Sequence, residues 1–202
     1  MRKNGFTLLE LMLAITLFSV AAIIAVSALF GVIAFQRKSL ALQRVQNNIN
    51  FAVKAMTVDI AVGDLYHCAT TVPSGPINDI LPQSCWSGGG PLIVFRNVRD
   101  EKTVYRLDNG VIERCVDVSA SGVCDTGSGP DYLQLTSSSV DIDNDCTGGP
   151  CSLFYVDGAE GTAAGDTKQP RTQVVISARA AVGRETEVIN LQTTVSQFRP
   201  DF

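Results

Sequence analysis

The sequence predicts an α+β fold, in which one long N-terminal α-helix packs on an antiparallel β-sheet head. Two observations lead to this fold class. A helical pattern continues without Pro as far as residue 62, and short β-rich runs separated by Gly- and Ser-rich segments follow it. The 202 residues suffice for one domain with an appendage. With 46% hydrophobic and 18% charged residues, the chain is too mixed to be disordered or a polytopic membrane protein.

The first segment of the helix is long and apolar enough to span a bilayer. Between Phe6 and Phe35, 24 of 30 residues are hydrophobic, and about 20 apolar residues suffice for a transmembrane helix. A secretory signal peptide has an apolar core of only about 7–15 residues, so it fits this length poorly. A plain signal anchor remains an alternative. We therefore expect a transmembrane helix over residues 6–35.

Glu10 is the single charged residue of this apolar segment. A carboxylate in the hydrocarbon layer is costly and marks a functional position unless a cation pairs with it. No Lys or Arg lies within a helical turn on its C-terminal side. A new α-amino group on Phe6 would supply the cation, and it would arise from a cut between Gly5 and Phe6.

The run from Arg2 to Glu10, Arg-Lys-Asn-Gly-Phe-Thr-Leu-Leu-Glu, resembles the start of type IV prepilins and type II secretion pseudopilins. The resemblance implies that a prepilin peptidase cuts after Gly5 and methylates the amine of Phe6. It also implies that Glu10 neutralises the Phe6 amine of a neighbouring subunit during assembly. The implied partners are other pilin or pseudopilin subunits, the prepilin peptidase and the inner-membrane assembly platform.

The same resemblance sets the expected location. Basic residues flank both ends of the apolar segment, at positions 2–3 and 37–38, so the positive-inside rule does not decide the orientation. The resemblance places the leader, residues 1–5, in the cytoplasm. We therefore expect a single-pass protein of the cytoplasmic membrane whose head lies in the periplasm or at the cell exterior, and which then enters a pilus or pseudopilus.

Residues 36–62 are expected to continue the helix as an amphipathic segment. An apolar stripe recurs at spacings of three and four residues, formed by Val45, Ile49, Ala52, Met56 and Ile60. Gly63 is the predicted stop. Two helices with a break near Gly31 or residues 36–37 are the alternative. Many major pilins carry a Pro partway along this helix, and Ser27 stands there instead.

The end of the helix has a second resemblance. Residues 56–60, Met-Thr-Val-Asp-Ile, are similar to minor subunits of the J or W type. Asp59 in this segment is expected to cap or pair locally, or to meet a partner subunit.

Residues 63–202 are predicted to form the disulfide-stabilised, β-rich head. Four Pro and a Gly-rich run indicate that residues 63–91 are a connection with little regular structure. A hairpin follows, because Asn109-Gly110 accepts the positive φ of a tight turn. The predicted strands are 92–97, 103–107, 111–116, 132–135, 140–142, 153–156, 173–179 and 186–198.

Six cysteines lie in the head, and their even number suits an oxidising compartment. Six cysteines allow 15 pairings. We favour pairing between sequence neighbours, because each such pair brackets a loop rich in Gly, Pro or Ser; the pairs are Cys68–Cys85, Cys115–Cys124 and Cys146–Cys151. A zinc site is disfavoured, since the chain has one His, His67, and no Cys-x-x-Cys.

A calcium loop is a weaker possibility. Asp141, Asp143 and Asp145 follow the spacing at the start of a calcium loop. However, Cys146 replaces the Gly of such a loop and Ser152 its final Glu, so an acidic turn is the simpler interpretation. No cofactor is otherwise expected. No catalytic motif is present, and His67 is alone and expected at a loop start, so we expect no enzyme.

The charge distribution separates the remaining function classes. The net charge of −4 combines three parts: residues 1–35 at +1, a basic stretch of residues 36–61 at +3, and a head, residues 62–202, whose 18 acids and 10 bases sum to −8. An acidic head disfavours nucleic-acid binding, although Arg96, Arg99, Lys102 and Arg106 lie close in sequence. The resemblance of the N-terminal run, with no Pro in the helix, implies a minor pilin or pseudopilin. The alternatives are a pilus-tip binding module, such as an adhesin or DNA-uptake pilin, and an unprocessed membrane-anchored domain.

Overall fold

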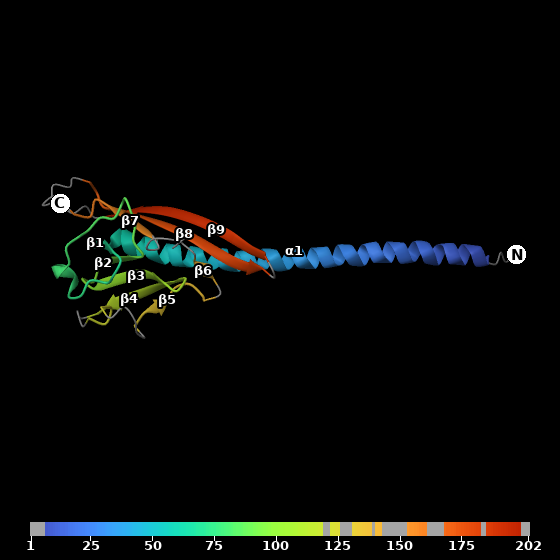
Figure 1. Cartoon of the computed structure of the whole chain (residues 1–202), viewed down its shortest axis with the longest axis horizontal. Coiled ribbons are helices and arrows are strands. Elements are labelled where there is room, and N and C mark those ends of the chain that lie inside the picture. The colour runs from blue at the N-terminus through green and yellow to red at the C-terminus, as the bar shows by residue number, and fades with distance from the viewer. Residues whose placement is uncertain are drawn as a thin grey trace. The chain divides into compact units, whose positions relative to one another are not determined.

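A computed structural model describes residues 7–118, 122–125, 131–138, 140–142, 153–160, 168–182 and 185–198. A helix, α1, is followed by antiparallel strands, which confirms the predicted α+β architecture (Figure 1). The chain divides into two compact units, Met1–Ala41 and Leu42–Phe202. The second unit contains the last part of α1 together with the head, since this part of the helix contributes its apolar stripe to the head core.

Helix α1 runs from Leu8 to Val62 without interruption, so the alternative of two helices is wrong. Its start is capped, because Oγ1 of Thr7 accepts a hydrogen bond of 3.3 Å from the backbone N–H of Glu10. The spacing Thr-x-x-Glu is that of a capping box. The helix ends at Gly63, as predicted. A Cβ there would lie 2.5 Å from the ring of Phe95, so only glycine permits this close approach to the sheet.

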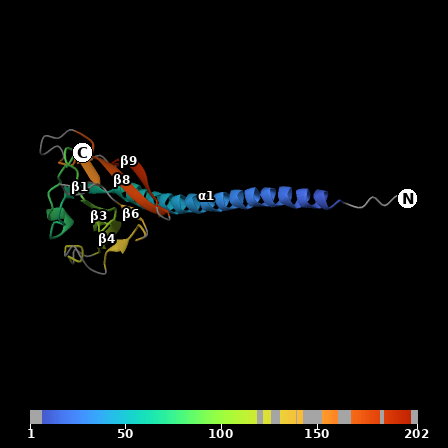
Figure 2. The same cartoon turned by 45° about the vertical axis from the view of Figure 1, so that its right-hand side comes forward.

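The predicted apolar stripe of α1 is buried at every position: Val45, Ile49, Ala52, Met56 and Ile60. It forms one core cluster with aromatic and aliphatic side chains of both sheets. In Figures 1 and 2, this part of α1 runs between strands β8–β9 on one side and the sheet containing β3 and β4 on the other. The amphipathic pattern thus places the helix within the head core.

The first sheet has the order β1-β2-β3-β4-β5, and all its pairs are antiparallel. Its strands are β1 Asp64–Ala69, β2 Leu92–Arg96, β3 Lys102–Asp108, β4 Val111–Asp117 and β5 Leu133–Gln134. The predicted hairpin turn joins β3 and β4, where Asn109 and Gly110 have φ of 47° and 76°.

The prediction that residues 63–91 contain little regular structure is wrong at two places. Strand β1 lies there, and so does a short 3-10 helix, Ile77–Asp79. Strand β1 forms through long-range pairing with β2, for example Cys68 opposite Ile93. A mixed polar sequence such as Asp-Leu-Tyr-His-Cys-Ala carries little strand signal of its own, because its partner comes 25 residues later.

The second sheet is built around β8, Arg171–Val182, which pairs with β9, Glu185–Ser196, over the whole length of both strands. The shorter strands β6, Asp141–Ile142, and β7, Phe154–Asp157, also pair with β8, near its opposite ends. All pairs are antiparallel. Every strand predicted after residue 91 is therefore present, with its ends shifted by a few residues.

The first sheet is buried on both faces. Ile93, Phe95 and Tyr105 point to the core that contains α1. Val94 and Val104 point the other way, into a second cluster that Cys115, Cys124 and Tyr132 help to form. This second cluster explains why β2 reads as a continuous apolar run rather than an alternating one.

Candidate functional site

The candidate site from the sequence is the start of α1. Gly5 and Phe6 lie outside the described residues, so cleavage between them and methylation of Phe6 stay predictions. Glu10 lies in the first turn of α1 and is exposed. Its backbone N–H is held by Thr7, which orients this turn and leaves the carboxylate at the surface of the helix. Within the described part of the chain, no cation pairs with this carboxylate.

The other polar side chains of this segment form their hydrogen bonds within the helix. The hydroxyls of Thr16, Ser19 and Ser27 each donate to the carbonyl oxygen three or four residues earlier, at 2.8–2.9 Å. Such bonds make Ser and Thr compatible with an apolar surrounding. Glu10 is therefore the one charged group that an apolar environment around Leu8–Phe35 would leave in need of a partner.

The apolar side chains of this segment are uncovered. Leu8, Phe18 and Phe30, for example, each expose two thirds or more of their surface. By length and composition, α1 is able to cross a membrane. An exposed apolar surface this large needs lipid or protein around it. The geometry thus describes a helix that must be covered, with one carboxylate near its start.

Comparison with known families is decisive for this segment. Residues 1–26 match the prokaryotic N-terminal methylation motif. This motif supports a pilin- or pseudopilin-type structural subunit, anchored by its N-terminal helix, processed by prepilin peptidase and assembled with other subunits of the same kind. No curated protein matches the chain, and no solved structure does. The motif therefore identifies the first 26 residues, and the head has to be interpreted from its own structure.

Asp59, at the other end of α1, pairs within the chain. Its Oδ2 accepts a hydrogen bond from the hydroxyl of Tyr105, at 2.6 Å, and forms an ion pair with Nη2 of Arg114, at 2.8 Å. Burial and the bond to Asp59 raise the pKa of Tyr105 above its usual range. Of the two roles expected for Asp59, local pairing is the one the structure contains.

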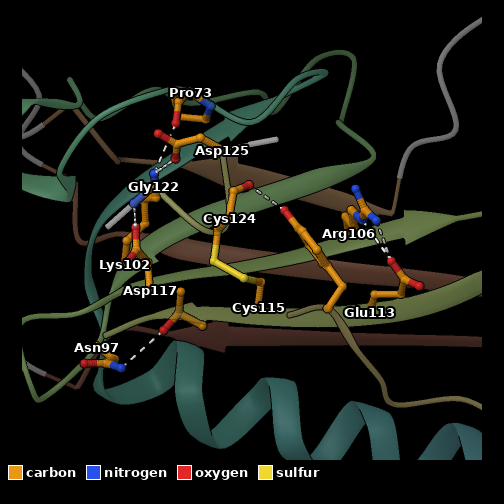
Figure 3. The surroundings of a disulfide bond; sticks show 12 residues. Pro73, Asn97, Lys102, Arg106, Glu113, Cys115, Asp117, Gly122, Cys124 and Asp125 are labelled. Atoms are coloured by element: carbon orange, nitrogen blue, oxygen red, sulfur yellow. Dashed lines mark hydrogen bonds and ion pairs between the residues drawn. A yellow bond between two sulfur atoms is a disulfide. The ribbon is translucent and has the colours of Figure 1, made fainter. Parts of the chain in front are cut away.

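Three of the four cations expected to form a basic cluster are engaged by acceptors of the head. Arg96 forms a bidentate pair with Asp64 at 2.6–2.7 Å. Arg106 pairs with Glu113 at 2.7 Å (Figure 3). Its guanidinium also lies over the ring of Tyr132. These pairs neutralise the charges that a phosphate backbone would need.

Lys102 is the third of these cations, and it is buried. Its Nζ donates to Asp125 and to the carbonyl oxygens of Pro73 and Gly75 (Figure 3). Burial alone would raise the pKa of Asp125, but the hydrogen bonds from Lys102 and from the N–H of Gly75 outweigh it and lower that pKa. Arg99 is exposed and lies in the turn between β2 and β3. The sequence cluster is thus a set of internal pairs and one surface arginine.

Two of the three expected disulfides are present. Cys68 is bonded to Cys85 and Cys115 to Cys124. Cys146 and Cys151 lie outside the described residues, so their pairing stays a prediction. The Cys115–Cys124 bond ties β4 to the segment that carries Asp125, beside the Lys102 network (Figure 3). This cystine and the Lys102 network hold the segments that carry Gly75 and Asp125 against the first sheet. We call these segments the cover of the first sheet.

The calcium hypothesis falls largely outside the described residues. Asp141 lies in β6 and is exposed, while Asp143 and Asp145 are not described. His67 was expected at a loop start, and this is wrong. It lies within β1, and its Nδ1 is 2.7 Å from the carbonyl oxygen of Leu81. Its neighbour Cys68 is a cystine and therefore no nucleophile.

Two features of the site were missed in the sequence. The capping role of Thr7 was readable, because Thr-x-x-Glu before an apolar run is a capping-box signal. The pairing of Lys102 with Asp125 was not, since 23 residues separate them and the pair depends on how the cover folds back over β3.

Proposed function

We propose that this chain is a minor pilin or pseudopilin, a structural subunit of a type IV pilus or a type II secretion pseudopilus. In this proposal the chain is cut after Gly5, methylated on Phe6 and assembled through α1. The observation that supports it most directly is the methylation motif over residues 1–26, placed at the start of an uncovered apolar helix.

The role of Glu10 follows from its surroundings. Its carboxylate lies in the capped first turn of α1, where the neighbouring exposed side chains are apolar. Burying it unpaired in a filament would cost several kcal/mol, whereas a cationic amine on a neighbouring helix would offset that cost. Glu10 therefore selects the register in which two helices associate. The minor class is part of this proposal and rests on the absence of a Pro within residues 8–62, while the likeness to J or W subunits rests on residues 56–60 alone.

The test separates processing from assembly. In the native host, mass spectrometry should find an N-methylated Phe6 as the first residue of the mature chain. Glu10→Ala should leave that terminus unchanged and lower the amount of subunit recovered in sheared filaments. Glu10→Asp keeps the charge and is the matched control. An intact Met1 in the mature protein would refute the proposal, and so would wild-type incorporation of Glu10→Ala.

The alternative of a tip-binding module for DNA is less well supported. Acceptors within the head engage three of the four basic residues, Arg96, Lys102 and Arg106. Of this group, Arg99 is then the residue left to contact a DNA phosphate. Retardation of a DNA duplex at low and moderate salt tests this alternative. Binding that persists at moderate salt would favour the uptake role.

A further inference from the structure

Strand β9 forms a long free edge of the second sheet (Figure 1). Among the described strands it pairs with β8 alone, and the register with β8 runs without a shift from Glu185 to Ser196. The first sheet differs at both of its ends. Strand β5 has only two residues, and Gln83 forms a bridge with His67 on the outer side of β1. Strand β9 is therefore the longest edge that the described strands leave open.

The hydrogen bonds after β9 show which backbone groups of this strand point outward. The N–H of Gln197 donates to the carbonyl oxygen of Pro170 at 3.0 Å and so continues the ladder with β8. The N–H of Phe198 points the other way, to the carbonyl oxygen of Ala61 at 2.7 Å. Because these directions alternate along an antiparallel pair, every second residue of β9 directs its N–H and C=O away from β8. No described group bonds to the outward groups of Val188, Asn190, Gln192 and Thr194.

This edge lacks the features that normally keep a free strand from pairing. Natural edge strands are protected by charged side chains, by Pro, by bulges or by short length. Residues 188–196, Val-Ile-Asn-Leu-Gln-Thr-Thr-Val-Ser, contain no charged residue and no Pro, and their register has no bulge. The exposed face of this stretch is neutral and mostly polar. The edge is therefore open to pairing with another chain.

The inner face of β9 indicates what that chain must present. Ile189 and Leu191 pack against the head core but are only partly buried. Their partners in β8, Ala178 and Ile176, are fully buried. Cover of this face thus decreases from β8 to β9. A further strand with apolar side chains on the same face would complete the cover of Ile189 and Leu191.

We propose that β9 binds an extended segment of a different filament subunit, which adds to the second sheet as a further strand. The segment alternates apolar side chains, which cover Ile189 and Leu191, with neutral polar side chains beside Asn190 and Gln192. Main-chain hydrogen bonds supply the affinity, and the alternation supplies the specificity. This inference rests on the proposed function, because a minor subunit has subunits of other kinds as its neighbours, and it names the head surface that meets one of them.

The first test uses the full chain in its own membrane and filaments. The photoreactive amino acid p-benzoylphenylalanine replaces Gln192, and mass spectrometry maps the cross-links. We expect a covalent product with a different filament subunit, joined within a segment that alternates apolar and polar residues. The same probe at Val118, which is exposed and follows β4, is the control and should not give this product. A product with a second copy of this chain, a product outside such a segment, or no product overturns the proposal.

Variants of Asn190 separate backbone pairing from a side-chain contact. Asn190→Pro removes one outward N–H but none of the hydrogen bonds to β8, a position at which an edge strand accepts Pro. It should lower the yield of the cross-linked product about tenfold. Asn190→Ala removes the side chain, keeps the N–H and should leave the yield unchanged. Equal yields in the two variants overturn the proposal, while an N-methylated Phe6 in the same samples shows that the proposed function still stands.

Hydrogen exchange of the wild-type chain tests the edge without any substitution. In the detergent-solubilised chain, the amides of Asn190 and Gln192 should exchange rapidly, because no described group accepts from them. The amide of Leu191, which faces β8, should be protected and is the internal control. In filaments, exchange at Asn190 and Gln192 should slow by about tenfold or more, because the added strand accepts from both. Equal rates in the two states overturn the proposal.

Discussion

The hydroxyl of Tyr105 donates a 2.6 Å hydrogen bond to Oδ2 of Asp59, which joins the middle of β3 to the last turn of α1. Nη2 of Arg114 of β4 forms an ion pair with the same oxygen at 2.8 Å. One carboxylate of the helix thus receives donors from two neighbouring strands. Since the ring of Tyr105 also stacks on Phe95 of β2, this contact sets how the helix lies on the first sheet.

Removing the Tyr105 hydroxyl should weaken the head without changing its shape. We expect Tyr105→Phe to lower the free energy of unfolding by about 1.5–3 kcal/mol, the range for a hydrogen bond to a charged group. Urea unfolding of the full chain in detergent micelles, followed by fluorescence of the single tryptophan, Trp86, measures it. Tyr155→Phe is the control, because no bond of its hydroxyl is seen among the described residues, and should cost less than about 0.5 kcal/mol. Equal losses in both variants would contradict this account.

Alkaline pH should destabilise the head through its buried tyrosines. Burial raises the pKa of Tyr105 and of Tyr132, and for Tyr105 the bond to Asp59 adds to it. A raised folded pKa means that the stability is present below the unfolded pKa, about 10, and is lost as the pH rises above it. Melting temperatures between pH 8 and 11 should therefore fall at the upper end. Tyr105→Phe should flatten this fall; an unchanged slope would argue against the role of Tyr105.

Lys102 should be among the most sensitive charged residues of the head. Its side chain is only 1% exposed and holds Asp125 and two loop carbonyls. We expect Lys102→Met to cost about 2–4 kcal/mol, because a partly buried carboxylate loses its partner. Lys168 also pairs with a carboxylate, that of Asp157, but its side chain is 65% exposed. Lys168→Met should therefore lower the free energy of unfolding by less than about 1 kcal/mol. If urea unfolding shows a larger loss of stability for Lys168→Met than for Lys102→Met, the structural role of Lys102 is disproved.

The two described disulfides should both stabilise the head. Cys68–Cys85 and Cys115–Cys124 span 17 and nine residues, and chain entropy predicts about 3 kcal/mol for each, slightly less for the shorter loop. Replacing either pair by alanine should lower the urea midpoint by a similar amount. Loss of the second pair should also expose the Lys102 network to hydrogen exchange. Unchanged protection of residues 102–104 would mean that the cover stays folded without its cystine.

Local patterns predicted much of this structure. The stripe from Val45 to Ile60, the Asn109-Gly110 turn and two cystine pairs all followed from spacing or turn chemistry, because each depends on residues close in sequence. Strand β1 and the pairing of Lys102 with Asp125 did not, because their partners are 23 or more residues away. Basic residues near one another in sequence also suggested a cluster that the sheet in fact distributes among separate carboxylates.

The amino-acid sequence by itself determined the N-terminal segment of this protein. A methylation motif, a cap at Thr7 and one carboxylate in an apolar helix are local features, and their chemistry needs no knowledge of the head. Only the tertiary structure decided which charges of the head are available. Pairing occupies Arg96, Lys102 and Arg106 but leaves Arg44 and Asp79 exposed, because ion pairs depend on how strands and loops meet in space.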